Sequence, residues 1–178
     1  MASDVRSPTG DDATTGTWST SPYWSKLDEY PTPDDGDFIT CTALSGGRGR
    51  QTFTFTAFAI PAGSTAISVS VRTRDRKAAS QGANVGAALK VGGTYYDAAG
   101  RNPAQAFTNY DDSWATNPKS AAAWTVDDVN GVGANGLQAF GVTTSDTTPN
   151  ISSSQAFITV TYTPPVTAIA PPIGAQIV

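Results

Sequence analysis

Residues 67–72 read Ile67-Ser68-Val69-Ser70-Val71-Arg72, with an apolar side chain at every second position. Neighbouring side chains of a β-strand point to opposite faces, so this alternation is typical of a strand with one face in the core and the other in water. The same period of two runs through residues 52–56, 85–91 and 156–162. Segments rich in Pro and Gly separate these runs, as expected for turns. The pattern predicts an all-β protein.

The composition supports this fold class. The chain has 178 residues, enough for one domain, and only 15% of them are charged, against about 25% in an average domain. We count about eight candidate strands and one short helix over residues 124–131, which Thr125 can cap and which ends before Gly131. We therefore expect an all-β, two-sheet antiparallel, jelly-roll-like β-sandwich with one short helix.

The chain divides into three parts by composition. Residues 1–16 are small and polar and predict a flexible N-terminal arm, and residues 17–163 contain the strands of the sandwich. Residues 164–178 form a Pro-rich, apolar C-terminal tail without charge. A solvated linker is normally polar, so we expect this tail to dock on a partner protein. The side chains predicted to bind that partner are Ile169, Ile173, Ile177 and Val178.

Charge argues against two classes of partner. The formal net charge is −4, whereas a nucleic-acid-binding protein needs a basic surface to neutralise phosphates. Arg72, Arg74 and Arg76 alternate along a predicted strand, so we expect them to line one solvated face. No apolar run approaches the roughly 20 residues of a membrane-spanning helix, and the N-terminal residues lack the apolar core of a signal peptide. We expect neither a nucleic-acid nor a membrane partner.

Residues suited to catalysis are few. The chain contains no histidine, so a Ser-His-Asp triad, a Cys-His pair and a His-ligated metal are all unavailable. The single cysteine, Cys41, lies in a predicted strand and reads as a small buried hydrophobe. Paired carboxylates could hydrolyse a glycosidic bond, but Glu29 is the only glutamate. We expect a protein that is not an enzyme, and glycan hydrolysis is the most distant hypothesis.

An acidic segment, Pro33-Asp34-Asp35-Gly36-Asp37-Phe38-Ile39, precedes the first clear strand. Ca²⁺ prefers several hard oxygen ligands, which makes Asp34, Asp35 and Asp37 the candidate metal ligands. The segment lacks the spacing of an EF-hand, and Asp in such loops commonly stabilises turns. We favour a solvated acidic loop without a cofactor, and keep calcium as the alternative.

Aromatic side chains could also form a platform on which a sugar stacks. The candidates are Trp24, Tyr95, Tyr96 and Trp114, each in or beside a polar, weakly charged segment. Large aromatic side chains are nevertheless more often part of a core. For that core we predict the side chains of the alternating runs: Phe53, Phe55, Ile67, Val69, Val71, Leu89, Val91, Phe157 and Val160.

The order of several motifs is similar to a β-sandwich family that recurs in structural proteins of tailed phages. The motifs are Trp18 to Ile39, the turn Ile60-Pro61-Ala62-Gly63, the segment Val91-Gly92-Gly93-Thr94-Tyr95-Tyr96, and Asn117-Pro118 leading to Ala123-Trp124-Thr125-Val126-Asp127-Asp128-Val129-Asn130. The similarity covers residues 17–163.

The resemblance implies a virion structural protein, most concretely a capsid decoration or cement protein. Its partners would be other virion proteins, above all the major capsid protein and further copies of itself. It would be made in the host cytoplasm and end on the virion surface. The alternative is a glycan- or receptor-binding module of a tail fibre or adhesion apparatus, because fold alone does not fix function.

Overall fold

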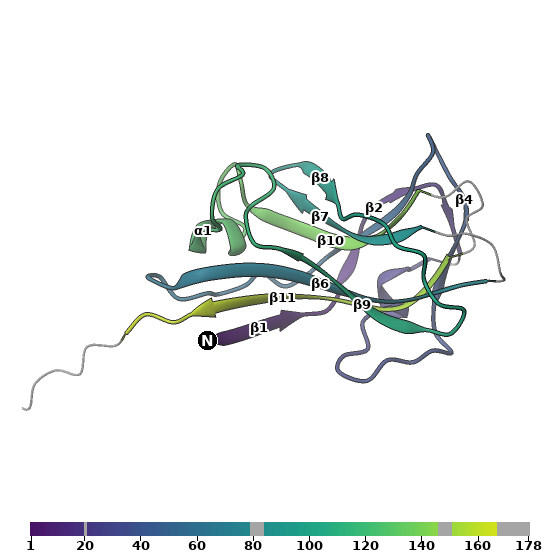
Figure 1. Ribbon diagram of the computed structural model, residues 1–178, viewed down its shortest axis with the longest axis horizontal. Coiled ribbons are helices and arrows are strands. Elements are labelled where there is room, and N and C mark those ends of the chain that lie inside the picture. Colours follow the sequence, from purple (N-terminus) through teal and green to yellow (C-terminus); the bar gives the residue numbers. More distant parts are fainter. Residues whose placement is uncertain (20, 79–83, 146–150, 167–178) are drawn as a thin grey trace, which may run out of the picture.

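A computed structural model describes residues 1–19, 21–78, 84–145 and 151–166 of the chain. These residues form two antiparallel sheets that pack face to face (Figure 1). Sheet 1 has the spatial order β3 (Thr17–Trp18), β4 (Ile39–Ala43), β11 (Ile151–Thr163), β6 (Thr65–Lys77) and β9 (Thr108–Trp114). Sheet 2 has the order β2 (Gly10–Thr15), β5 (Gly49–Thr54), β10 (Leu137–Thr144), β7 (Val85–Val91) and β8 (Thr94–Asp97).

The strand order is that of a jelly roll. Strands β4, β11, β6 and β9 face β5, β10, β7 and β8, and the chain changes sheet after every strand from β4 onward except at the β7–β8 hairpin. Eight strands in two sheets of four with these crossings define the jelly roll, and β1 to β3 are additions to it. The predicted all-β, two-sheet sandwich is confirmed.

The first residues belong to the sandwich. Strand β1 (Ala2–Arg6) pairs with the second half of β11, Ala2 lying opposite Tyr162, and β2 pairs with β5 in the other sheet. The prediction of a flexible arm over residues 1–16 is therefore wrong for these two segments. Both contain Asp and Ala, which are depleted in strands, and neither shows a clear alternation, but β11 is long enough to pair with β4 and β1 along the same edge.

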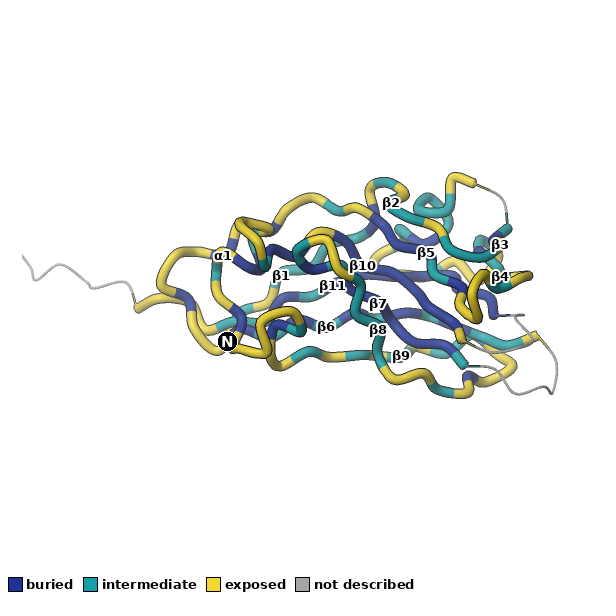
Figure 2. The backbone as a smooth tube through the Cα atoms, turned by 90° about the horizontal axis from the view of Figure 1, so that it is seen from above, coloured by how far each residue is buried: buried dark blue, intermediate teal, exposed yellow. Residues whose placement is uncertain are grey.

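The core lies between the sheets, where the tube in Figure 2 is buried. It contains Phe53, Ile67, Val69, Val71, Leu89, Val91 and Val160, all as predicted from the alternation. Phe55 is only partly buried, because β5 ends at Thr54 and the chain leaves the sheet there. It still packs on Phe58 and Phe140, with ring centroids 5.5 Å and 5.7 Å away.

Phe157 was misplaced by the prediction. It is buried but does not belong to the inter-sheet core, since it lies opposite Arg72 on the outer face of sheet 1. The Arg72 guanidinium carbon lies 5.6 Å from the ring centroid, and Tyr30, which precedes the acidic loop, packs edge-on at 4.8 Å. These two side chains, not the opposite sheet, shield Phe157 from water.

The short helix is confirmed as α1 (Val126–Val129), shorter than predicted. Thr125 caps it, since its Oγ1 accepts a hydrogen bond from the Asp128 amide while the Asp128 carboxylate accepts one from the Thr125 amide. This reciprocal capping box satisfies two backbone donors of the first turn. In the part of the chain that the structure describes, no helix is long and apolar enough to cross a membrane.

Candidate functional site

The two ends of the sandwich differ in charge. One end carries the loops 55–66, 92–93, 115–125 and 130–136 together with residues 161–166. We call it the uncharged end, because Lys119 is the only charged side chain in these segments. Helix α1, which lies at this end in both views, adds Asp127 and Asp128 (Figures 1 and 2).

The loops of the uncharged end are fixed by internal hydrogen bonds. Asn130 of the α1 loop both accepts from the Ile60 amide, at 2.9 Å, and donates to the Ile60 carbonyl, at 3.1 Å. The Lys119 ammonium donates to the carbonyls of Gly92 and Ala134, at 2.6 Å and 2.7 Å. The one cation of these loops is thus used to tie two of them together. The loops of this end are therefore ordered.

Exposed apolar side chains gather at the same end. Of the four large apolar side chains that are exposed in the described residues, Met1, Val132 and Val166 lie here, with exposed fractions of 94%, 56% and 95%. Met1 lies here because Ala2 pairs with Tyr162 near the end of β11. Figure 1 shows the chain leaving the sandwich beyond β11 on this side.

The predicted partner-binding residues follow directly after this exit. Pro164, Pro165 and Val166 are exposed, and Gly63 lies near Pro165. Ile169, Ile173, Ile177 and Val178 lie outside the described residues, so the prediction that they bind a partner stays a prediction. The structure shows that the chain leads into this segment from the uncharged end.

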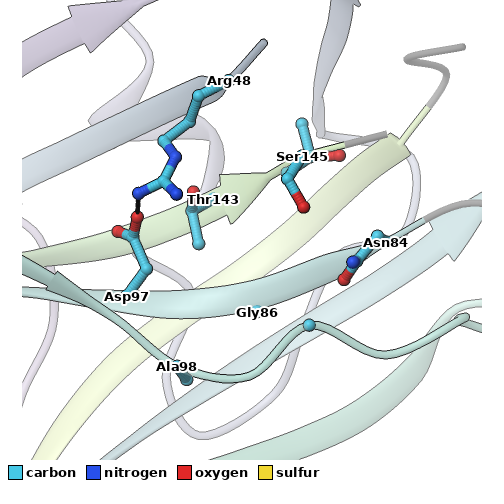
Figure 3. Close-up of a pocket in the computed structure, with 9 residues that line it drawn as sticks. Arg48, Asn84, Gly86, Asp97, Ala98, Thr143 and Ser145 are labelled. Atoms are coloured by element: carbon cyan, nitrogen blue, oxygen red, sulfur yellow. Dashed lines mark ion pairs between the residues drawn. The ribbon is translucent and has the colours of Figure 1, made fainter. Parts of the chain in front are cut away.

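The opposite end, which we call the charged end, holds the acidic loop, the start of β5, the ends of β6 and β8, and the loop that contains Arg101. Arg50 binds Asp97 through two hydrogen bonds of 2.7 Å and 3.0 Å, and Arg48 pairs with the same carboxylate (Figure 3). Arg50 reaches Asp97 across β10 and β7, where Gly86 and Ala88 leave room for its side chain. Ion pairs of this geometry order the outer face of sheet 2.

A small polar cavity lies beside this ion pair. Its volume is about 40 Å³, and Figure 3 shows Arg48, Asp97, Thr143, Ser145 and Asn84 around it. Sites for small-molecule ligands usually measure about 300 Å³ or more, so this cavity has room for water-sized molecules only.

Further along the same face, Asp12 ties β2 to β7 and β8. Its carboxylate accepts hydrogen bonds from Lys90 at 2.8 Å, from Thr52 at 2.9 Å and from Tyr95 at 3.0 Å. Burial alone would raise the pKa of Asp12, but these three donors outweigh it and lower the pKa below its usual value. The network holds the second N-terminal strand in place.

Arg72, Arg74 and Arg76 share the outer face of sheet 1, as predicted, but they are half-buried rather than solvated. Arg72 binds Asp111, Arg74 binds Asp35 through two bonds of 2.7 Å, and Arg76 lies between the rings of Phe38 and Phe107. Each arginine therefore has a partner within the protein.

The three candidate calcium ligands point to different partners. Asp35 binds Arg74 and Ser154, Asp37 pairs with Lys26 at 2.8 Å, and Asp34 accepts from the Gly36 amide at 2.8 Å as the cap of a turn. No group of three or more acidic, His or Cys side chains in the described residues is arranged to hold a metal. We predict that millimolar calcium, added to a chelated sample, leaves the melting temperature unchanged.

The candidate sugar-stacking residues lie apart. Trp24 is in the 3₁₀ helix η1 (Trp24–Lys26) and Trp114 ends β9, and both pack partly against the core, as does Tyr96. Neighbouring Tyr95 points to the other face of β8, where its ring lies under Arg50, 4.6 Å from the guanidinium carbon. The structure does not bring these four rings together.

Cys41 is buried in the core, as expected. Burial raises the pKa of its thiol to about 11, which keeps it protonated and unreactive near neutral pH.

Sequence reasoning did not identify the uncharged end. The signal was present as uncharged runs, residues 51–71, 129–145 and 147–178, but only the topology brings parts of these runs together. Comparison with models of protein families gives no match for the chain, and comparison with curated proteins gives none either.

Proposed function

We propose that the chain is a structural protein of a phage particle, a decoration or cement protein that attaches through its uncharged end and displays the rest of the sandwich. The observation that carries the proposal is the uncharged end, where exposed apolar side chains meet the exit of an apolar, Pro-rich segment. The central part of a protein–protein interface is depleted of charged residues, because an unpaired charge is costly to remove from water.

Two further observations support a binding role over a catalytic one. The described cavity beside Asp97 admits only water-sized molecules, and the jelly roll is an architecture used by viral capsid and lectin domains. Architecture alone does not fix function, so the weight rests on the distribution of charge. The particle surface follows as the proposed location, and the capsid shell as the proposed partner.

Adding one negative charge at either end of the sandwich tests the attachment. Ala62→Asp and Val132→Asp add a carboxylate at exposed positions of the uncharged end, and Ser45→Asp adds the same group at an exposed turn of the charged end. Particles produced without the protein are mixed with each variant and pelleted. We expect the two uncharged-end variants to bind at least about tenfold more weakly, which corresponds to about 1.4 kcal/mol, and Ser45→Asp to bind like wild type. Equal binding of all three would contradict the proposal.

The apolar segment is tested by ending the chain after Thr163. Strand β11 is complete at that residue, so we expect the shortened protein to melt like the full chain. We expect its occupancy on particles to fall, because a proline-stiffened apolar segment loses little entropy when it binds. Unchanged occupancy would show that residues 164–178 are not needed, and that the protein attaches through the folded part of the uncharged end.

The alternative, a glycan- or receptor-binding module, has weaker support because Trp24, Tyr95, Tyr96 and Trp114 do not share a surface. A glycan array distinguishes the two proposals. Specific retention of one glycan class, lost on Trp24→Ala or Tyr95→Ala with the fold intact, would favour the alternative.

A further inference from the structure

Asp75 is a carboxylate buried at the charged end without an ion-pair partner in the described residues. It lies on the inner side of β6 with an exposed fraction of 0%. Thr73 Oγ1 donates to one carboxylate oxygen at 2.5 Å, and Ser153 Oγ on β11 donates to the other at 2.6 Å. Both donors are neutral hydroxyls, which can also accept a hydrogen bond. The pocket around Asp75 therefore suits the protonated carboxyl as well as the ionised one.

Two charged groups act on Asp75 from neighbouring elements. Asp112 on β9 binds Arg101 from the preceding loop and also accepts the Ala87 amide at 2.8 Å. Within the described part of the chain, the other terminal nitrogen of Arg101 is buried without a partner. Asp112 therefore pairs with Arg101 directly, whereas Asp75 is acted on by the same guanidinium only through space. If both were ionised, this part of the protein would hold one uncompensated negative charge.

The other elements around Asp75 supply no counter-charge. Arg74 and Arg76, its neighbours on β6, point to the outer face of the sheet, where Asp35 and two phenylalanines hold them. The Cys41 thiol of β4 stays neutral because burial raises its pKa to about 11. The inward residues of β7 and β10 at this end are uncharged: Val85, Ala87, Val142 and Thr144.

We propose that Asp75 holds a proton in the folded protein at mildly acidic pH, and that loss of this proton loosens the charged end of the sandwich. Burial raises the pKa of Asp75 to about 6, and the nearby Asp112 adds to the rise, while the two hydroxyls and Arg101 only partly oppose it. The charged end would then be a proton-sensitive region. The inference does not depend on the proposed function.

The sign of the effect follows from the two pKa values. In the unfolded chain Asp75 would titrate near its ordinary value of 3.8, and in the folded protein near 6. Between these values the folded state binds more protons than the unfolded state, so stability falls as the pH rises through this window and is level above it. Asp12 and Asp35 act in the opposite sense, because their pKa values are lowered by folding.

The direct test is a carbon-13 NMR titration of the aspartate side-chain carboxyls in the full-length wild-type protein. We expect one carboxyl resonance to titrate near pH 6, to be absent in Asp75→Asn, and to titrate at lower pH in Asp112→Asn, where Arg101 is free to act on Asp75. A buried carboxyl that stays ionised down to pH 4 would overturn the inference. The titration of the wild-type protein alone can contradict the inference, so the test does not depend on whether a variant folds.

A second measurement tests the loosening itself. Urea unfolding of wild type and Asp75→Asn is compared between about pH 4 and about pH 7. The unfolding constant of wild type should rise relative to that of Asp75→Asn by about a hundredfold, as two pKa units imply. Amide hydrogen exchange at the two ends of β6 in one sample is the internal control: protection should fall near Asp75 and stay constant near Ile67. A constant ratio of the two unfolding constants would contradict the proposal.

Discussion

The uncharged end and the charged end of this sandwich are built from the same strands, yet they are held together differently. At the uncharged end Phe55 packs on Phe58 and Phe140, and the loops are joined by neutral groups and one lysine. At the charged end, Arg50 and Asp97 pair on the outer face of sheet 2, and Asp75 occupies an inward position that a simple core would give to an apolar residue. A surface free of charge is easily removed from water, whereas a surface of mutually paired charges is not. The contrast indicates which end is suited to a lasting contact.

The largest effect should come from the apolar packing near the uncharged end. Phe140→Ala removes a fully buried ring that contacts Phe53 and Phe55, and we expect it to lower the free energy of unfolding by about 3–5 kcal/mol. The matched control is Phe38→Ala, the same truncation in the outer clamp around Arg76, for which we expect about 1 kcal/mol. Chemical denaturation measures both. Equal losses of unfolding free energy in the two variants would show that Phe140 contributes no more to stability than a ring on the outer face.

An intermediate effect is expected from the ion pair at the charged end. Asp97→Ala leaves the largely buried Arg50 guanidinium without its two charge-assisted hydrogen bonds, and should lower the free energy of unfolding by about 2 kcal/mol. Asp111→Ala is the control, because its pair with Arg72 is exposed and such pairs contribute at most about 1 kcal/mol. If thermal and urea unfolding gave the same loss for both, the Arg50–Asp97 pair would have no special role.

The smallest expected effect is an increase in the free energy of unfolding. Thr144 Oγ1 is buried at the charged end and has no hydrogen-bond partner in the described residues. Thr144→Val replaces the hydroxyl by a methyl group of similar size, so we expect the free energy of unfolding to rise by about 1 kcal/mol. Thr143→Val, which removes a hydroxyl that donates to the Gly49 carbonyl, should instead lower it. A loss of stability in Thr144→Val would mean that its hydroxyl has an unseen partner.

Alternation along single strands was sufficient to predict the fold class and most of the core. The first half of β6, through Val71, and the whole of β7 carry apolar side chains at their inward positions, so the local pattern and the final environment agree there. The N-terminal strands β1 and β2 were missed because their pairing depends on the length of β11 and the edge of β5, which no local pattern encodes. Phe157 was misplaced because Tyr30, distant in sequence, covers the outer face there.

The candidate site was predictable only in part. An apolar, uncharged segment after residue 163 was visible in the sequence, and so was the arginine face of β6. The uncharged end was not, because it is assembled from loops that lie up to about a hundred residues apart along the chain and meet only through the jelly-roll crossings. The three loop aspartates resembled a metal site in sequence, but each one binds a different partner in the fold.

The measurement that tests the central claim most directly is a density map of the intact phage particle, at a resolution that orients the sandwich. We predict that the sandwich lies on the shell with residues 61–64 and 130–136 facing it, that residues 164–178 run along the shell protein, and that the acidic loop and Arg48 face the solvent. A sandwich attached through its charged end, or particles that do not contain the protein, would contradict the account.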